Sequence, residues 1–386
     1  MTGLEMGLAA VLRPWLIWRS RPGMVRSALA HLSCREALPA ELPRVRIAAV
    51  QFNIDLSASA VSYARHVHAL VSQAVEGGAS LVIFPEYTSL PLVGLMPGAR
   101  RLSRALESAA AIPKQARPAG GSDYATMALA FRLSAVAAQR VYHTTFSTLA
   151  ARFRVTILGG SIIEPGSDGR LRNAAYLYGP DGGLLARQVK THLMPSEVAM
   201  GYARGEEIVV AETPVGRLAF PVCMDHTYFE TARIAALLGA DLLVDPAANN
   251  DYYDAYAQAR GVWSRTQETQ VYGVLCCAVG RVAGVVFQGR SGVYAPLGLS
   301  ANGDGVLAEA RSCDLEEIVF AELDYALLRE FRWHHPPEYN LALYRRYLPA
   351  LYAAEGRGMA LGPQRWHNEA DTIQKGRSWG ARQGGT

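Results

Sequence analysis

The stretch VRIAAVQ at residues 45–51 is followed by a helical pattern over 57–76 and by the stretch LVIF at 81–84. The first and last stretches are short, apolar and β-branched, which predicts buried strands. Between them, apolar residues recur every three or four positions until Gly77-Gly78 ends the helix. A strand, a helix and a strand in this order predict a parallel sheet with a right-handed crossover, and therefore an α/β fold.

The rest of the chain continues the alternation of strands and helices. A helix is expected over 123–153, with a break near Tyr142-His143, and a second over 253–270. A hairpin is expected around GPDGG at 179–183, because Gly, Pro and Asp favour tight turns. The segment 87–121 carries four prolines and five basic residues, which predicts a long irregular connection. Further strands are expected over 155–158, 216–222, 242–244, 271–279, 292–295 and 318–323.

Composition excludes several classes of protein. A net charge of +4 over 386 residues is too small for a dedicated nucleic-acid binder, and half of the residues are hydrophobic. No apolar run approaches the roughly 20 residues that a membrane-spanning helix needs. The five cysteines are odd in number and scattered, without zinc-site spacing, which favours a reduced, cytoplasmic protein with no metal and no cofactor.

The two ends of the chain differ from its centre. Residues 1–43 precede the first strand and are expected to be either poorly ordered or docked on the domain, with an interfacial helix as one alternative. Residues 44–330 form the main domain, and 331–363 form a helical extension that is a candidate oligomer contact. Residues 364–386 are polar and contain Gly and Arg, which predicts a disordered tail.

Three reactive side chains end three of the predicted strands. Glu86 follows the strand at 81–84, Lys190 ends the second hairpin strand, and Cys223 follows the apolar run at 216–222. A helix is expected to begin at Thr227, and a thiol at such a strand-to-helix turn becomes nucleophilic more readily. Since ligands of α/β sheets bind beyond the carboxyl ends of the strands, these side chains are expected to converge on one crevice.

These motifs resemble those of the nitrilase superfamily, the carbon–nitrogen hydrolases. The resemblance rests on FPE ending at Glu86, VKTHLMP around Lys190 and PVCMD around Cys223, in that order, and it covers residues 45–328. It implies a single domain with a four-layer αββα sandwich that pairs into a homodimer or larger homo-oligomer. Because Met224 follows the cysteine, the chain is more similar to amidase-like, poorly characterised branches than to true nitrilases.

The resemblance also implies roles for particular residues. Cys223 would be the nucleophile that forms a thioester, Glu86 the general base and acid, and Lys190 the group that stabilises the oxyanion together with the backbone N–H of Met224. Glu197 would support Lys190, with a solvent-facing loop carboxylate as the alternative. The order of the chain also suggests Tyr87 and Asn249 as substrate-binding residues.

Other interpretations remain open at this stage. His226 could form a Cys–His pair with Cys223, although it is expected to point away. The expected function is cleavage of a non-peptide C–N bond in a small amide. Transfer of the acyl group to an amine, nitrile hydrolysis and a non-catalytic oligomeric binding module are the alternatives.

Overall fold

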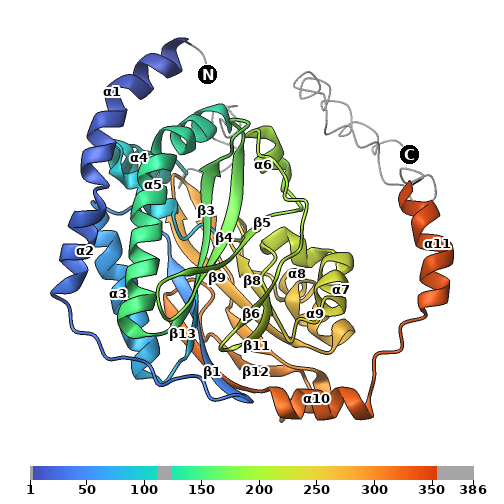
Figure 1. Cartoon of the computed structure of the whole chain (residues 1–386). Helices are drawn as coiled ribbons and strands as arrows, with labels where there is room; N and C mark the ends of the chain where they lie inside the picture. The colour runs from blue at the N-terminus through green and yellow to red at the C-terminus, as the bar shows by residue number, and fades with distance from the viewer. Residues whose placement is uncertain (1–2, 111–123, 354–386) are drawn as a thin grey trace, which may run out of the picture. The chain divides into compact units, whose positions relative to one another are not determined.

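The computed structural model describes residues 3–110 and 124–353 (Figure 1). The chain divides into two units, residues 1–336 and 337–386. The described part of the second unit contains one helix, α11 (Leu341–Ala353). All strands and the other helices belong to the first unit.

The strands of the first unit form one mixed sheet, and β1 (Arg44–Asn53) joins the two halves of this sheet. The order along the sheet is β5-β4-β3-β2-β1-β9-β8-β7-β6, with β13 paired to β1. β1 pairs with β2 and β13 over residues 44–51, and its last residues pair with β9. The other strands are β2 (Leu81–Ile83), β3 (Thr156–Pro165), β4 (Leu171–Tyr178), β5 (Leu184–Val189), β6 (Val210–Thr213), β7 (Gly216–Ala219), β8 (Leu242–Ala247), β9 (Tyr272–Val282), β10 (Val285–Phe287), β11 (Gly292–Tyr294), β12 (Val306–Glu309) and β13 (Glu317–Asp324).

Three apolar clusters divide the first unit into layers. Along β1, Ile47 and Ala49 point into a cluster shared by the two halves of the sheet, whereas Ala48 and Val50 point toward the helices. The helix-side cluster includes α3 (Ala60–Glu76) and α5 (Tyr124–Phe153), and a third cluster lies between β8, β9 and the helices α7 (Phe229–Leu237) and α9 (Val262–Thr269). Alternation along the strands therefore builds the predicted αββα sandwich.

The structure corrects four predictions about individual helices. The segment predicted to be irregular contains η1 (Leu90–Leu95) and α4 (Ala99–Ala110), and α5 runs through the expected break. The helix expected over 253–270 is divided into α8 (Ala255–Ala259) and α9 by Arg260 and Gly261. Finally, η3 (Cys223–Thr227) precedes α7, so that this helix begins at Phe229 and not at Thr227.

The residues before β1 contain two helices. These are α1 (Gly3–Arg19) and α2 (Pro22–Ala30), and the latter contacts α3 and α5. Leu16, Val25 and Leu29 are buried in the helix-side cluster. In residues 3–110 and 124–353, no helix is long and apolar enough to cross a bilayer. The remaining elements are α6 (Pro195–Ala199), η4 (Leu297–Leu299) and α10 (Tyr325–His334), and the tail at 364–386 lies outside the described residues.

Candidate active site

The three side chains predicted at strand ends come from different parts of the sheet. Glu86 lies three residues beyond β2, and Lys190 immediately follows β5. Cys223 opens η3, four residues beyond β7. Both β2 and β7 run parallel to their neighbours β1 and β8, so their carboxyl ends face the same edge of the sheet.

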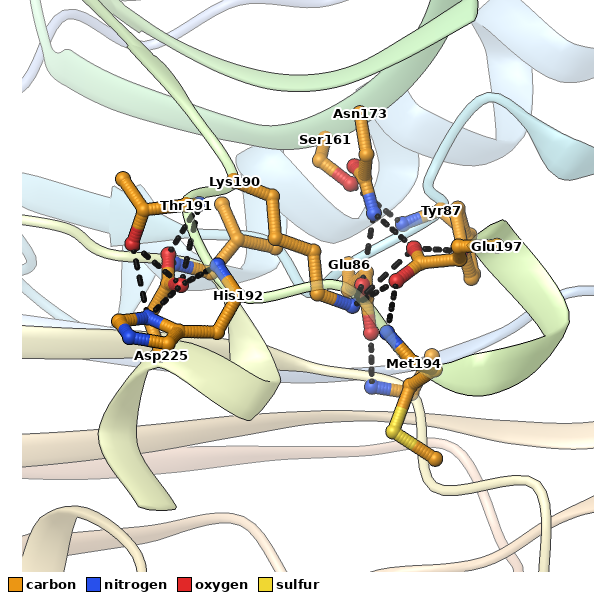
Figure 2. A network of polar contacts seen from close by, with 12 residues as sticks. Glu86, Tyr87, Ser161, Asn173, Lys190, Thr191, His192, Met194, Glu197 and Asp225 are labelled. Carbon is orange, nitrogen blue, oxygen red and sulfur yellow. Dashed lines mark hydrogen bonds and ion pairs between the residues drawn. The ribbon is translucent and has the colours of Figure 1, made fainter. Parts of the chain in front are cut away.

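Lys190 stands between two carboxylates. Its Nζ lies 2.8 Å from Oε1 of Glu86 and 3.0 Å from Oε2 of Glu197 (Figure 2). Each of the three residues is only 1% exposed. A buried charge is stable only when it is paired and hydrogen-bonded. Here the ammonium of Lys190 pairs with the carboxylates of both Glu86 and Glu197. Glu197 is therefore part of this buried cluster, and its alternative as a solvent-facing loop residue is wrong.

Neighbouring groups fix the positions of both carboxylates. Asn173 donates from Nδ2 to Oε1 of Glu86 at 2.7 Å and to Oε1 of Glu197 at 3.2 Å. The backbone N–H of Ala248 donates to the other oxygen of Glu86 at 3.0 Å. The hydroxyl of Tyr87 donates to Glu197, so this side chain belongs to the polar network. Both oxygens of Glu86 thus have fixed partners, and the carboxylate has one orientation.

Cys223 has a backbone conformation that few residues adopt. Its φ is 51°, in the left-handed region, where a residue with a Cβ is strained. Unlike Glu86 and Lys190, it keeps part of its surface exposed. Burial of the sulfur raises the pKa of the thiol well above its ordinary value, the Glu86 carboxylate raises it further, and Lys190 lowers it. The three groups are therefore close enough to interact, and the thiol is protonated at rest.

The two charged partners of the thiol have shifted pKa values. Burial raises the pKa of Glu86, and the attraction of Lys190 only partly offsets this, because Glu197 also repels a second negative charge. Burial alone would lower the pKa of Lys190, but Glu86 and Glu197 together raise it well above its ordinary value. Lys190 consequently stays charged, whereas the Glu86 carboxylate takes up a proton more readily than an exposed glutamate.

Asp225 connects the cysteine turn with the segment after Lys190. Its Oδ2 accepts from the backbone N–H of Val222 at 2.9 Å. Its Oδ1 accepts from the backbone N–H groups of Thr191 at 3.1 Å and His192 at 2.6 Å (Figure 2). Burial would raise the pKa of this carboxylate, but hydrogen bonds from His192, Thr191 and Val222 lower it. One buried carboxylate thus fixes the turn that carries Cys223 relative to the segment that follows Lys190.

A further buried acid interacts with the thiol. Asp245, in β8, is 4% exposed, and burial raises its pKa well above the ordinary value, with a further contribution from Glu86. Its Oδ1 has no hydrogen-bond partner among the described residues. Asp245 therefore takes up a proton more readily than an exposed aspartate.

Other predicted residues lie around this network. Asn249 follows Ala248 and is exposed, while Met224 follows Cys223 in η3. His226 is fully buried, and its Nε2 lies 3.0 Å from the carbonyl oxygen of Pro221 and 3.1 Å from that of Val244. Its Nδ1 has no hydrogen-bond partner among the described residues, so His226 forms no hydrogen bond with Cys223, as its predicted orientation implied. No group of three or more His, Cys, Asp or Glu residues in the described ranges could hold a metal ion.

Two residues of the network were missed from the sequence. Asn173 is a fully buried amide at the third position of the strand LRNAAYLY, whose other buried residues are aliphatic or aromatic, and a polar residue among them is a usable signal. Asp225 lies two positions after the cysteine, where it resembles an ordinary helix cap. Nothing in its local sequence indicates its bonds to Thr191 and His192, which depend on the tertiary fold.

Comparison with known proteins identifies the family. A sequence model of the family described as "Carbon-nitrogen hydrolase" matches residues 46–332. The chain is 31% identical over 214 residues to the probable hydrolase YhcX of Bacillus subtilis (strain 168), which covers 52% of this chain and only 41% of that relative. It is 28% identical over 316 residues to the chloroplastic omega-amidase of Arabidopsis thaliana, covering 78% of this chain and 74% of the relative.

A solved structure shows the same fold. The crystal structure of Saccharomyces cerevisiae Nit3, a member of branch 10 of the nitrilase superfamily, superposes with a TM-score of 0.54 at 22% identity, covering 77% of this chain and 96% of Nit3. The matched region of the family model contains Glu86, Lys190 and Cys223. This chain belongs to the carbon–nitrogen hydrolase family.

Proposed function

We propose that the chain hydrolyses the C–N bond of a small, non-peptide amide, with Cys223 as the nucleophile and a thioester as the intermediate. The observation that carries the proposal is the Cys223 thiol, on a residue of intermediate exposure, beside the buried Glu86–Lys190–Glu197 cluster. A protonated thiol next to a fixed carboxylate can be activated without a histidine. The omega-amidase relative supports amides as the substrate class.

In the first half of the reaction, Glu86 takes the proton of the Cys223 thiol while the sulfur attacks the carbonyl carbon of the amide. Glu86 then gives this proton to the leaving nitrogen, the C–N bond breaks, and a thioester remains on the sulfur. A positioned proton-transfer group of this kind contributes roughly 10²–10⁴-fold to a rate. The bonds from Asn173 and Ala248 keep Glu86 in the orientation that both transfers require.

Lys190 and the backbone N–H of Met224 stabilise the negative charge on the carbonyl oxygen. One donor to such an oxyanion is typically worth about 3–4 kcal/mol. The pKa of Lys190 is raised well above its ordinary value, so its charge persists throughout the reaction. Glu197 holds the ammonium from its other side, and Tyr87 and Asn173 hold Glu197 in turn.

In the second half of the reaction, Glu86 takes a proton from water, and the resulting hydroxide attacks the thioester. The carboxylic acid leaves, and the proton returns to the sulfur. An amine in place of water would give acyl transfer, and a nitrile in place of the amide would give nitrilase activity. Asn249 is exposed beside the Glu86-binding backbone, which supports it as a substrate contact at the entrance.

A panel of small amides and nitriles, assayed for ammonia release, tests this proposal. We expect release from at least one amide, together with a mass increase on Cys223 that hydroxylamine removes. Cys223→Ala should lose both signals, whereas Cys34→Ala, which changes another partly exposed cysteine, should retain them. Full turnover by Cys223→Ala would contradict the proposal. Ammonia release from nitriles alone would favour the nitrilase alternative.

Location and assembly are also proposals. All five cysteines are free, which supports the reducing cytoplasm as the location of the chain. The amphipathic helix α11 supports the expectation that residues 331–363 contact another copy in a homodimer or larger homo-oligomer. Light scattering tests that expectation on the full chain and on a chain that ends at residue 336. The particles of the shorter chain should contain fewer copies than those of the full chain.

A further inference from the structure

A hollow of about 430 Å³ lies between α1 and the N-terminal end of α4. Arginines dominate its lining, with Arg19 from α1 and Arg100, Arg101 and Arg104 from α4, beside the indole of Trp15. Figure 1 shows the two helices next to each other at the end of the sheet nearer the N-terminus. None of these residues belongs to the Glu86–Lys190–Cys223 site.

The positive charge of this hollow is not balanced locally. The sequence has no Asp or Glu over 6–35 or over 87–106, and α4 carries a single carboxylate, Glu107, which accepts a hydrogen bond from Ser103. Among the residues that the structure describes, no carboxylate forms an ion pair with any of the four. Since the whole chain carries a net charge of only +4, this is a local concentration of charge that attracts anions.

The geometry of α4 brings its guanidinium groups to one face. Arg100 and Arg104 are four positions apart and Arg101 and Arg104 three, so Arg104 is a neighbour of both on the helix surface. Arg19 is fixed in place because it donates from Nη1 to the carbonyl oxygen of Leu95 at 3.1 Å and from Nη2 to that of Ala58, and it lies 4.5 Å from the ring centre of Trp15. The hollow therefore combines one anchored guanidinium with three exposed ones on α4.

We propose that this hollow binds a phosphate-bearing anion. Guanidinium groups bind phosphate oxygens in pairs of parallel hydrogen bonds, and several of them around one cavity suit a group with more than one negative charge. The start of α4 at the hollow adds the positive end of a helix dipole. The phosphate can belong to a soluble molecule or to a lipid headgroup. Val11 and Trp18 on α1 are 74% and 52% exposed, and only a lipid would also contact such apolar groups.

The test uses the full chain and two probes. Calorimetry measures binding of inorganic pyrophosphate, and cosedimentation measures binding to vesicles of equal parts phosphatidylcholine and phosphatidylglycerol, with pure phosphatidylcholine as the reference. The variant Arg101→Gln/Arg104→Gln removes two charges from the hollow. The matched control Arg260→Gln/Arg329→Gln removes two exposed arginines outside it. Thermal unfolding verifies that both variants remain folded.

We expect the wild type and the control to bind pyrophosphate, and the α4 variant to bind at least about tenfold more weakly. Pyrophosphate binding without vesicle binding assigns a soluble phosphorylated ligand. Vesicle binding that needs phosphatidylglycerol and is lost in the α4 variant assigns a headgroup. If the wild type binds neither probe, or the α4 variant binds as the control does, the proposal is overturned. Amide hydrolysis is independent of all these outcomes.

Discussion

At the scale of single residues, the protonation of Glu86 controls the proposed reaction. The reactive form is the carboxylate, which exists only above its pKa, and burial together with Glu197 raises that pKa. Activity should therefore fall as pH is lowered, with a midpoint above the roughly 4.3 of an ordinary glutamate. The pH profile of kcat/KM for a substrate amide measures this midpoint.

The control for this pH profile is a measurement of whether the protein stays folded over the same pH range. Circular dichroism over the same pH range should show no unfolding at the midpoint of the activity loss. A midpoint at or below the value of an exposed glutamate would contradict the role of Glu86 as the base.

Asp225 should act on catalysis through the position of other residues. In Asp225→Asn an amide N–H₂ replaces one oxygen, so either Val222 or the pair Thr191 and His192 loses its acceptor. We expect kcat to fall by roughly 10²-fold with a smaller change in KM, since small misplacements of reacting groups have effects of this size. Alkylation of Cys223 by iodoacetamide should slow as well.

The matched control for Asp225→Asn is Asp324→Asn. Asp324 also accepts from backbone N–H groups, at the start of α10, outside the catalytic network. This control should leave kcat and the alkylation rate unchanged. Equal losses of kcat in the two variants would mean that Asp225 has only a general structural role.

The sequence predicted which residues end the strands but not how they are held. Glu86 and Cys223 follow apolar runs and Lys190 ends a hairpin strand, so their common edge could be predicted from strand pattern and parallel topology. The network around them uses partners distant along the chain. Asn173 is 87 residues from Glu86 and Asp225 is 34 from Thr191, and such pairings arise only from the folded sheet.

At the scale of elements, β3 must pass very close to the turn that carries Glu86. Gly160 has a φ of +71°, and a Cβ built on it would lie 1.9 Å from the carbonyl oxygen of Pro85 and 2.3 Å from Oγ1 of Thr88. In Gly160→Ala, the segment after β2 has to move. We expect a loss of about 2–4 kcal/mol in the free energy of unfolding, with a disproportionate loss of activity.

Gly303→Ala separates this steric effect from backbone strain. Gly303 has a similar φ of +69° but nothing within 4 Å of an added Cβ. It should lose only about 1 kcal/mol and retain activity. Urea unfolding curves compare the two variants, and equal shifts of their midpoints would contradict the proposed contact.

Helices were harder to predict than strands, for identifiable reasons. Pro91 sits in the first turn of η1 and Pro97 lies just before α4, positions at which proline is compatible with a helix. The prolines nevertheless made 87–121 look irregular. The expected break in α5 was wrong because Tyr142 and His143 neither remove a backbone donor nor clash with the preceding turn.

At the scale of the whole molecule, the layer order could be predicted but the contribution of the first 43 residues could not. Two buried strands joined by an amphipathic helix already imply sheet covered by helix. Residues 1–43 showed no clear period, because α1 and α2 bury only a few side chains each. Their packing partners are α3 and α5, which lie far along the chain.

Leu29 tests whether α2 is an integral part of the domain. It is fully buried in the cluster between α2, α3, α5 and the sheet, so Leu29→Ala leaves a cavity there. We expect a loss of about 2–5 kcal/mol in the free energy of unfolding. Leu38 is the matched control, because it is 77% exposed and Leu38→Ala should change that free energy by less than about 0.5 kcal/mol. If the urea midpoints of both variants equal that of the wild type, α2 contributes nothing to the stability of the catalytic domain, and the first 43 residues are a separable extension.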